Sequence, residues 1–376
     1  MRLRGLPCSL VVAGALVLCA TAAAGPPQVD ARAVYVQDGT TGEVLYASQE
    51  HERVPIASIT KLMTVLVTLQ HARLDDVVVV SPKAAAIGES TIELHAGDRL
   101  TVRELLEGAL IQSANDAAWA LASYVGHGSV PRFVSMMNAR ARALGLRDTH
   151  FVRPDGLDAP GHVSSARDVT RLARIAMRRP IVRKIVRMRT ASISGGRTLS
   201  TWNDLLGVYP GVIGVKTGHT SLAGWNEVAA DRWHDMTLFA TILGSPSRYQ
   251  RDADLERLLT WARGQYRYLP VVSRGAAYAT TSTAFGRGTV RLVAPRSVYR
   301  AVRLADPVVQ RTVVDRTASL PVERGDRLGE VALYQHGRLL ARSPLVAARS
   351  VSRPGVVSRV GWYVRKTVEN VWGWVT

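Results

Sequence analysis

The sequence predicts a mixed α/β fold in which helices cover an antiparallel sheet, followed by a small all-β domain and a C-terminal amphipathic helix. Three observations support this prediction. Strand-like runs come first, a block of helical patterns follows, and strands return before a last helix, which is the order expected for an antiparallel sheet covered by helices. Beyond Gly264, short alternating runs between Gly, Pro and Asp turns indicate strands alone. From Pro354 the apolar side chains follow helical spacing again.

Segment 1–24 is predicted to be a secretory signal peptide. Two arginines precede the apolar run Leu10–Ala20, and small residues follow it. Cleavage after Ala22 or after Ala24 fits the preference for small residues around the cut. The apolar run is too short for a comfortable membrane span. We therefore expect an exported protein.

Both cysteines of the chain, Cys8 and Cys19, lie in this leader. The mature protein is therefore expected to have no disulfide, no thiol nucleophile and no cysteine metal site. A lipoprotein signal ending at Cys19 is an alternative for the leader, but Leu18 is bulky at a position where such signals prefer a small residue. The nine histidines are scattered, so that we predict no metal site and no cofactor.

The chain of 376 residues is strongly basic, with a formal net charge of +18. Attraction to anionic lipid or to an anionic polymer would explain this charge, and so would simple solubility. A nucleic-acid partner is not expected, because export removes the protein from nucleic acid and the sequence has no nucleic-acid-binding motif.

The first part of the mature chain is expected to form a hairpin, two helices and a short strand. Two β-rich runs around turn residues predict the hairpin Ala33–Ser48. An apolar helix begins near Ser58, and a strand covers Val77–Val80. The sequence Thr101–Glu104 resembles a capping box, which opens a helix that ends near Gln112.

A short polar stretch, Ser113–Asp116, separates that helix from an alanine-rich one and is well placed to project side chains into a cleft. The elements expected after it are the helices Ala117–Tyr124 and Pro131–Leu144, the loop Phe151–Gly161, a basic amphipathic helix capped by Ser164 or Ser165 and running to about Arg178, and a shorter helix after Pro180.

Strands are expected again in the next segment. Val212–Val215 and Lys216 form a strand that Gly218 ends or bends. Glu227–Ala230 and Met236–Leu243 are the next two strands, and Arg251–Trp261 is the closing helix.

Three segments therefore follow the leader: an α/β domain at 25–263, an all-β domain at 264–350 and a tail at 351–376. In the tail, tryptophans accompany the helically spaced apolar residues, and charged side chains interrupt any continuous apolar run. This pattern favours an amphipathic helix that lies in a membrane interface as a peripheral anchor. A helix packed on the β domain is the alternative.

Ser58 and Lys61 are the first candidates for chemistry. Residues three apart on a helix share a face, so that the lysine amine can reach the serine hydroxyl. A neutral lysine beside a serine is a base beside a nucleophile. Only five of the 48 basic residues are lysines, and arginine cannot act as a base because it keeps its proton. This scarcity favours a chemical role over that of a surface lysine.

Two further motifs follow, Ser113-x-Asn115 on the interhelical stretch and Lys216-Thr217-Gly218 on a strand. Each is weak alone. In this order, in an exported protein, they combine with Ser58-x-x-Lys61 to form the constellation of penicillin-binding proteins and class A β-lactamases.

The chain resembles the serine D-Ala-D-Ala carboxypeptidases, the low-molecular-mass penicillin-binding proteins of peptidase family S11. The likeness is nearly end to end and includes the β domain and the tail. One departure is Ala114, where the family usually has glycine. Beyond the three motifs the likeness rests on Asn115–Ala117, Phe151–Leu157, Ala166–Asp168, Trp202–Leu206, Lys216–Thr220 and Ala223–Gly224.

The resemblance implies a β-lactamase/transpeptidase-like catalytic domain and a set of catalytic roles. Ser58 Oγ attacks the penultimate D-alanine carbonyl of a peptidoglycan pentapeptide and forms an acyl-enzyme. Lys61, neutral because burial and neighbouring charge lower its pKa, accepts the proton. Ser113 relays a proton towards the departing D-alanine, and Asn115 holds Lys61 or the peptide amide. Water then releases the shortened peptide, and β-lactams are expected to inhibit by acylating the same serine.

The resemblance also implies how the substrate is held. Lys216 and Thr217, with Gly218 in the same motif, bind the terminal carboxylate, and Arg251 assists them. The backbone N–H groups of the nucleophile and of His219 form the oxyanion hole. Together with the leader and the tail, these roles imply a peripheral enzyme at the periplasmic face of the cytoplasmic membrane.

Three alternatives remain open at this point. A class A β-lactamase shares the motifs, but it usually has one domain and a glutamate that activates the deacylating water, for which this sequence has no clear counterpart. A DD-endopeptidase with the same site would cut cross-links. A wall-binding scaffold would keep the site without using it.

Overall fold

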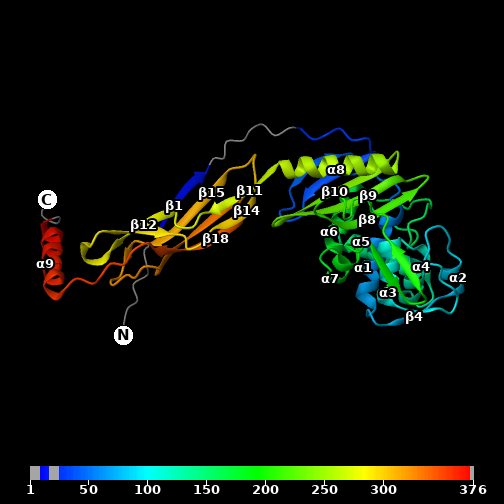
Figure 1. The fold of residues 1–376 in the computed structure, drawn as a ribbon, viewed down its shortest axis with the longest axis horizontal. Coiled ribbons are helices and arrows are strands. Elements are labelled where there is room, and N and C mark those ends of the chain that lie inside the picture. The colour runs from blue at the N-terminus through cyan, green and yellow to red at the C-terminus, as the bar shows by residue number, and fades with distance from the viewer. Residues whose placement is uncertain (1–8, 17–24, 373–376) are drawn as a thin grey trace. The chain divides into compact units, whose positions relative to one another are not determined.

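A computed structural model describes residues 9–16 and 25–372 of the chain. The chain divides into two compact units. Of the described residues, 25–264 form one of them, which we call the helix–sheet unit, and 265–372 together with 9–16 form the other, which we call the β unit. Figure 1 shows both units.

The helix–sheet unit is built around a five-stranded antiparallel sheet, as predicted. Its strand order is β3-β2-β10-β9-β8, and all four strand pairs are antiparallel. The strands are β2 (Ala33–Asp38), β3 (Val44–Ser48), β8 (Val212–Thr220), β9 (Gly224–Trp233) and β10 (Met236–Ser245).

Helices cover both faces of this sheet (Figure 1). On one face, α8 (Arg248–Gly264) packs on β9 and β10. On the other face, α6 (Ala166–Ala176) contacts β2 and β10 and connects the sheet to the helical part of the unit. The remaining helices are α1 (Lys61–His71), α2 (Pro82–Ala85), α3 (Val102–Glu107), α4 (Asn115–Val125), α5 (Val130–Ala143) and α7 (Pro180–Ile185).

Helix α1 is the centre of the helical part. Its residues from Lys61 to Thr68 are all buried, and it contacts α4, α5 and α6. A helix that is buried on every side is part of the protein interior, and the polar side chains of Thr64 and Lys61 find hydrogen-bond acceptors there. Four alanines among its eleven residues allow α4 to pack closely. The serine–lysine pair therefore lies at the start of a buried helix that packs on three others.

The helix predicted from the capping box has an irregular end. Thr101 and Glu104 cap α3 reciprocally as expected, but the helix continues as the π-helical segment η2 (Gly108–Gln112). Ser113 then adopts a left-handed conformation, with φ 63°. Such π segments widen a helix by one residue and are frequent at functional sites.

Several boundaries differ from the prediction. Helix α4 begins at Asn115, two residues earlier than expected, and α8 begins at Arg248 instead of Arg251. Gly218 does not end its strand, because β8 continues to Thr220. The sequence analysis did not identify α2, the strand β5 (Arg99–Thr101) that pairs with β4 (Val77–Val79), or the hairpin of β6 (Thr190–Ile193) and β7 (Arg197–Ser200). Elements of three or four residues are too short to show a period.

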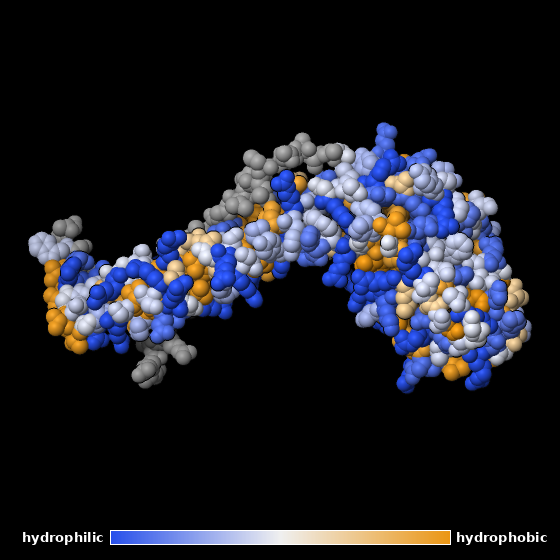
Figure 2. Space-filling view, viewed as in Figure 1, coloured by the Kyte–Doolittle hydropathy of each residue, from blue (hydrophilic) through white to orange (hydrophobic). Residues whose placement is uncertain are grey.

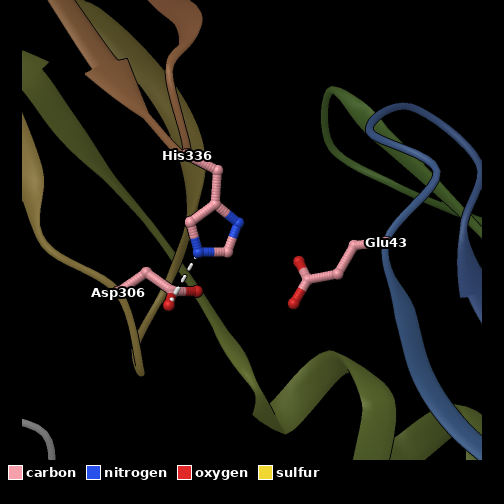
Figure 3. Close-up of side chains that lie close together, drawn as sticks. All are labelled: Glu43, Asp306 and His336. Atoms are coloured by element: carbon pink, nitrogen blue, oxygen red, sulfur yellow. Dashed lines mark ion pairs between the residues drawn. The ribbon is translucent and has the colours of Figure 1, made fainter.

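The β unit is all-β apart from its last helix, as predicted. Its main sheet has the order β1-β15-β17-β18-β13-β12-β16 and covers a core of aliphatic side chains that includes Val272, Val290 and Leu345. At the tip of the hairpin between β17 and β18, His336 pairs with Asp306 at 2.8 Å (Figure 3). The strands are β11 (Tyr266–Val272), β12 (Ala277–Thr283), β13 (Thr289–Val293), β14 (Val298–Arg303), β15 (Val308–Asp315), β16 (Thr317–Ala318), β17 (Arg327–Gln335) and β18 (Arg338–Ala347).

The first and the last element that the structure describes both belong to the β unit. Part of the predicted leader forms strand β1 (Ser9–Leu16), which pairs with β15. The predicted cleavage region near Ala22 and Ala24 lies outside the described residues. The tail forms helix α9 (Val356–Trp372). Hydrophobic side chains of α9 are exposed, as Figure 2 shows at the left of the view.

Candidate active site

Ser58 lies on the 3-10 turn η1 (Ala57–Thr60), directly before α1. Its Oγ accepts a hydrogen bond of 2.7 Å from Lys61 Nζ. Ala57 has a positive φ of 49°, which costs a non-glycine residue about 1–3 kcal/mol and is common where a catalytic side chain must be held in place. The geometry expected of Ser58-x-x-Lys61 is therefore present.

Lys61 is fully buried, and its amine has three acceptors. They are Ser58 Oγ at 2.7 Å, Asn115 Oδ1 at 2.6 Å and the backbone carbonyl of Asp155 at 2.8 Å. Burial lowers the pKa of Lys61 to about 8, although the carboxylates of Asp155 and Asp116 oppose this shift. At pH 7 about one molecule in ten then carries a neutral amine. This lysine can accept a proton from Ser58.

The carbonyl of Asp155 is aimed at Lys61 by its own side chain. The Asp155 carboxylate accepts hydrogen bonds from Trp119 Nε1 at 2.7 Å and from Arg153 Nε at 2.6 Å. Thr64, one turn along α1 from Lys61, donates to the carbonyl of Pro154 at 2.6 Å. The loop predicted at 151–161 is thus hydrogen-bonded to α1 through two consecutive backbone carbonyls, those of Pro154 and Asp155.

Close backbone contacts hold the same loop against the turn η1, which carries Ser58. Gly156 has φ +91°, and a Cβ there would lie 2.0 Å from the carbonyl oxygen of Ala57. His162 Nδ1 accepts from the backbone N–H of Val152, so its Nε2 donates to Thr60 Oγ1 at 2.8 Å. Burial lowers the pKa of His162 to about 4, which keeps this ring neutral.

Ser113 and Asn115 face the site from the junction of η2 and α4. The Ser113 hydroxyl accepts a hydrogen bond of 2.9 Å from Lys216 Nζ. Asn115 accepts from Lys61 through Oδ1 and donates through Nδ2 to the carbonyl of Gly88 at 3.0 Å. Because both ends of its amide are used, the orientation of Asn115 is fixed.

Lys216 is also fully buried. Besides Ser113 it donates to the carbonyl of Thr217 at 2.8 Å. Burial lowers its pKa, and the charge of Lys61 lowers it further, whereas Glu227 opposes the shift. Lys216 is therefore hydrogen-bonded to Ser113 in the same way as Lys61 is hydrogen-bonded to Ser58.

Strand β8 brings the third motif, Lys216-Thr217-Gly218, against the turn η1 that carries Ser58. A Cβ at Gly218 would lie 2.8 Å from the carbonyl oxygen of Ile56 and 3.0 Å from the backbone nitrogen of Ser58. Only glycine allows this approach. The next residue, His219, stacks its ring on Trp225 with centroids 4.0 Å apart.

These residues open on a pocket of about 290 Å³. Arg251 forms part of its wall, although its side chain is only 2% exposed. The residues that line the pocket are Ser58, Glu89, Ser90, Ser113, Trp202, Thr217, Gly218, His219, Trp225, Arg248 and Arg251. The pocket thus joins the hydroxyls of Ser58 and Ser113, among others, to the guanidinium groups of Arg248 and Arg251, which suits a substrate with a carbonyl close to a carboxylate.

The sequence analysis missed the acids behind Arg251. Its guanidinium contacts Asp252 at 2.6 Å, Asp204 at 3.3 Å and Glu227 at 3.2 Å. Two of these acids lie in segments that the sequence analysis used for other reasons, Asp204 in Trp202–Leu206 and Glu227 at the start of the predicted strand 227–230. In the helix–sheet unit, as far as it is described, no three His, Cys, Asp or Glu side chains converge closely enough to hold a metal ion.

The chain is similar in sequence and in fold to known proteins. Residues 20–247 match the model of the Peptidase_S11 family, described as D-alanyl-D-alanine carboxypeptidase. The D-alanyl-D-alanine carboxypeptidase DacD of Salmonella typhimurium is 34% identical over 90% of each chain, and DacF of Bacillus subtilis is 30% identical over 88% of each. The crystal structure of penicillin binding protein 5 from Haemophilus influenzae is similar with a TM-score of 0.64 and 27% identity, over 88% of this chain and 100% of that one.

Proposed function

This chain belongs to the D-alanyl-D-alanine carboxypeptidase family and is a serine-type hydrolase of that class. We propose that it removes the terminal D-alanine from peptidoglycan pentapeptide stems through an acyl-enzyme on Ser58. The observation that carries this assignment is the 2.7 Å hydrogen bond between Ser58 Oγ and the buried amine of Lys61. It supplies a nucleophile and a base in contact, beside a cationic pocket.

Acylation follows from this contact. Neutral Lys61 accepts the hydroxyl proton as Ser58 Oγ forms a bond to the penultimate D-alanine carbonyl. The C–N bond to the last D-alanine then breaks, and its amine leaves with a proton delivered by way of Ser113. The hydrogen bond from Lys216 to Ser113 supports this relay. Asn115 keeps the Lys61 amine pointed at the nucleophile.

The oxyanion formed in this step needs hydrogen-bond donors fixed in advance. We assign this role to the backbone N–H groups of Ser58 and His219. The close approach of Gly218 to the Ser58 nitrogen supports the assignment, because it brings the two backbone segments together. Water then attacks the ester carbonyl and gives up a proton to Lys61, which releases the shortened peptide and restores the serine.

The terminal carboxylate of the substrate defines the reaction as that of a carboxypeptidase. Lys216 and Thr217 would bind it at the end of the motif on β8, and Arg251 would add a third positive or polar contact. Arg251 lines the pocket, which supports this role. Binding at several cationic groups fixes the scissile bond over Ser58.

A β-lactam tests the nucleophile directly. We expect a fluorescent penicillin to label the wild type stoichiometrically and to add its mass to the peptide that contains Ser58. Ser58→Ala should take no label. Labelling of Ser58→Ala to the same extent would show that another residue is the nucleophile, and rapid release of the label would favour a β-lactamase.

We also propose that the enzyme is exported and held at the periplasmic face of the cytoplasmic membrane by α9. Valines, Tyr363 and Trp372 of this helix are exposed, and its cationic residues include Arg359 and Lys366. Such a helix suits an anionic membrane interface. Among the described residues, no helix has the length and apolar character needed to cross a bilayer.

A further inference from the structure

Glu227 is a buried acid that the mechanism above does not use. It lies on β9, opposite Thr217 of β8 in the strand register, and its side chain is 0% exposed. Among the described residues, neither of its carboxylate oxygens has a hydrogen-bond donor. A buried carboxylate without hydrogen bonds is costly to ionise, so the charges around Glu227 decide whether it holds a proton.

The neighbour that Glu227 approaches is Arg251 in the pocket wall. The Glu227 carboxylate lies 3.2 Å from Arg251 Nε, without the alignment of a hydrogen bond. The same guanidinium is already hydrogen-bonded to Asp252, at 2.8 Å through Nε and 2.6 Å through Nη2. Glu227 is therefore a second, poorly bonded partner for a cation that has a better one.

The charges around Glu227 balance one another when Glu227 is ionised, so that a further carboxylate would be uncompensated. From α8 it faces Arg251 and Asp252, from the segment before β8 it faces Asp204, and from β8 it faces Lys216. Asp204 is in turn paired with Arg248. With all groups ionised, three positive charges meet three negative ones. A substrate carboxylate would be the fourth negative charge in a mostly buried cluster.

We propose that Glu227 is a proton-linked positioning residue, which must be neutral for Arg251 and Lys216 to bind the carboxylate of the substrate. When Glu227 is protonated and the other groups, Lys216 included, are ionised, the cluster has one positive charge in excess, and the incoming carboxylate neutralises it. When Glu227 is ionised, it competes with the substrate for Arg251. Binding of the substrate is therefore coupled to uptake of one proton by the enzyme.

The local electrostatics agree with this coupling. Burial raises the pKa of Glu227 to about 7, while Arg251 lowers it and Asp252 raises it. The free enzyme thus holds both forms of Glu227 near neutral pH. A substrate carboxylate adds negative charge and shifts the balance further towards the protonated form. The two forms differ by one charge at the place where the substrate is recognised.

This inference rests on the proposed function, and it predicts an effect on KM rather than on kcat. If only the enzyme with protonated Glu227 binds productively, KM for an acyl-D-Ala-D-Ala peptide rises up to about tenfold between pH 6 and pH 8. The turnover number depends on Lys61 instead, and it should rise over the same range as that amine loses its proton.

The test measures kcat and KM from pH 6 to pH 9 for the wild type, Glu227→Gln and Glu227→Leu. Both variants lack the titrating group, so their KM should stay near the low wild-type value at pH 6 throughout this range, with kcat changed less than about threefold. Asp231→Asn is the matched control. Asp231 is a buried acid on the same strand β9, but it pairs with Arg263, so its variant should keep the wild-type rise in KM.

Labelling with fluorescent penicillin separates the possible failures. A Glu227 variant that takes one label on Ser58 is folded and has a working nucleophile, so its KM profile can be interpreted. If labelled Glu227→Gln and Glu227→Leu both retain the wild-type rise in KM, another group, such as Lys216, causes it and the proposal is wrong. A loss confined to kcat would also contradict it. If the wild type takes no label at all, the proposed function fails instead.

Discussion

Two buried lysines lie beside the two candidate serines, Ser58 and Ser113, and their neighbours differ. Lys61 has three uncharged acceptors around its amine, which leave it free to lose its charge. Burial lowers the pKa of Lys216 as well, but Lys216 lies near Glu227 and near Arg251 of the pocket wall. We therefore assign proton transfer to Lys61 and charge recognition to Lys216. The same side chain can serve both purposes because burial shifts a lysine pKa readily, which is not true of arginine.

The first prediction at this scale concerns Lys61→Arg. The guanidinium keeps its proton at any accessible pH, so it cannot act as the base. We expect acylation by penicillin to slow by about 10²–10⁴-fold, the usual contribution of a general base. Stopped-flow labelling measures it. Lys184→Arg on the exposed surface of α7 is the matched control and should acylate normally, and equal rates for the two variants would exclude Lys61 as the base.

The second prediction concerns pH. Burial lowers the pKa of Lys61 to about 8, and the reactive form is the neutral one. The acylation rate constant at saturating penicillin should therefore increase as pH rises from 6 and level off above about pH 8. A rate that falls over this range would mean that the protonated amine is the active form.

Sequence alone could predict most of the site at this scale. Ser58, Lys61, Ser113, Asn115 and Lys216 lie within hydrogen-bonding reach of one another in the pairs described above. The hydrogen bond from Lys61 to Asp155 could not be predicted, because its acceptor is a backbone carbonyl, which every residue type has. Glu227 lies in no motif, and its closeness to Arg251 depends on how α8 packs on the sheet.

At the scale of the elements, three backbone segments are pressed together around the nucleophile. They are the turn η1, the loop 151–161 and strand β8, and glycines stand where two of them meet η1. The spacing of apolar residues along the sequence predicts strands and long helices well, because it shows which face of an element is buried. It does not report a π segment or a 3-10 turn, which depend on tertiary packing.

A third prediction tests the contact between loop and turn. Gly156→Ala places a Cβ against the Ala57 carbonyl at 2.0 Å in a residue with φ +91°. We expect a loss of about 2–4 kcal/mol in the free energy of unfolding and slower acylation, since the Asp155 carbonyl must move away from Lys61. Urea denaturation and penicillin labelling measure the two effects.

The matched control for that change is Gly128→Ala. Gly128 has nearly the same φ, +87°, but a Cβ there has nothing within 4 Å. It therefore measures the conformational cost alone, about 1 kcal/mol, with no change in acylation. If both variants lose the same stability and both acylate normally, the close packing of the loop has no part in positioning the nucleophile.

At the scale of the whole molecule, the chain joins a hydrolase unit to a β unit that ends in α9. The division after Gly264 follows a change in composition that the sequence shows clearly, from helical and long apolar patterns to short alternating strands. The leader and the membrane-binding role of the tail remain predictions, because they concern processing and a lipid surface.

A fourth prediction tests that role. A chain truncated after Ser350 lacks α9, and we expect it to leave the membrane fraction and appear in the soluble one. Its penicillin labelling should be unchanged, because Ser58 lies in the helix–sheet unit. Fractionation of both chains followed by labelling measures the two properties together. A truncated chain that still sediments with membranes would contradict the tether.

The central claim is that Ser58 is the nucleophile of a carboxypeptidase acting on D-alanine termini. The most direct measurement is the release of free D-alanine from a pentapeptide that ends in D-Ala-D-Ala, by the wild type and by Ser58→Ala. We predict release of one D-alanine per peptide by the wild type and none above the uncatalysed background by the variant. Equal release by both proteins, or no release by a wild type that penicillin labels on Ser58, would contradict the claim.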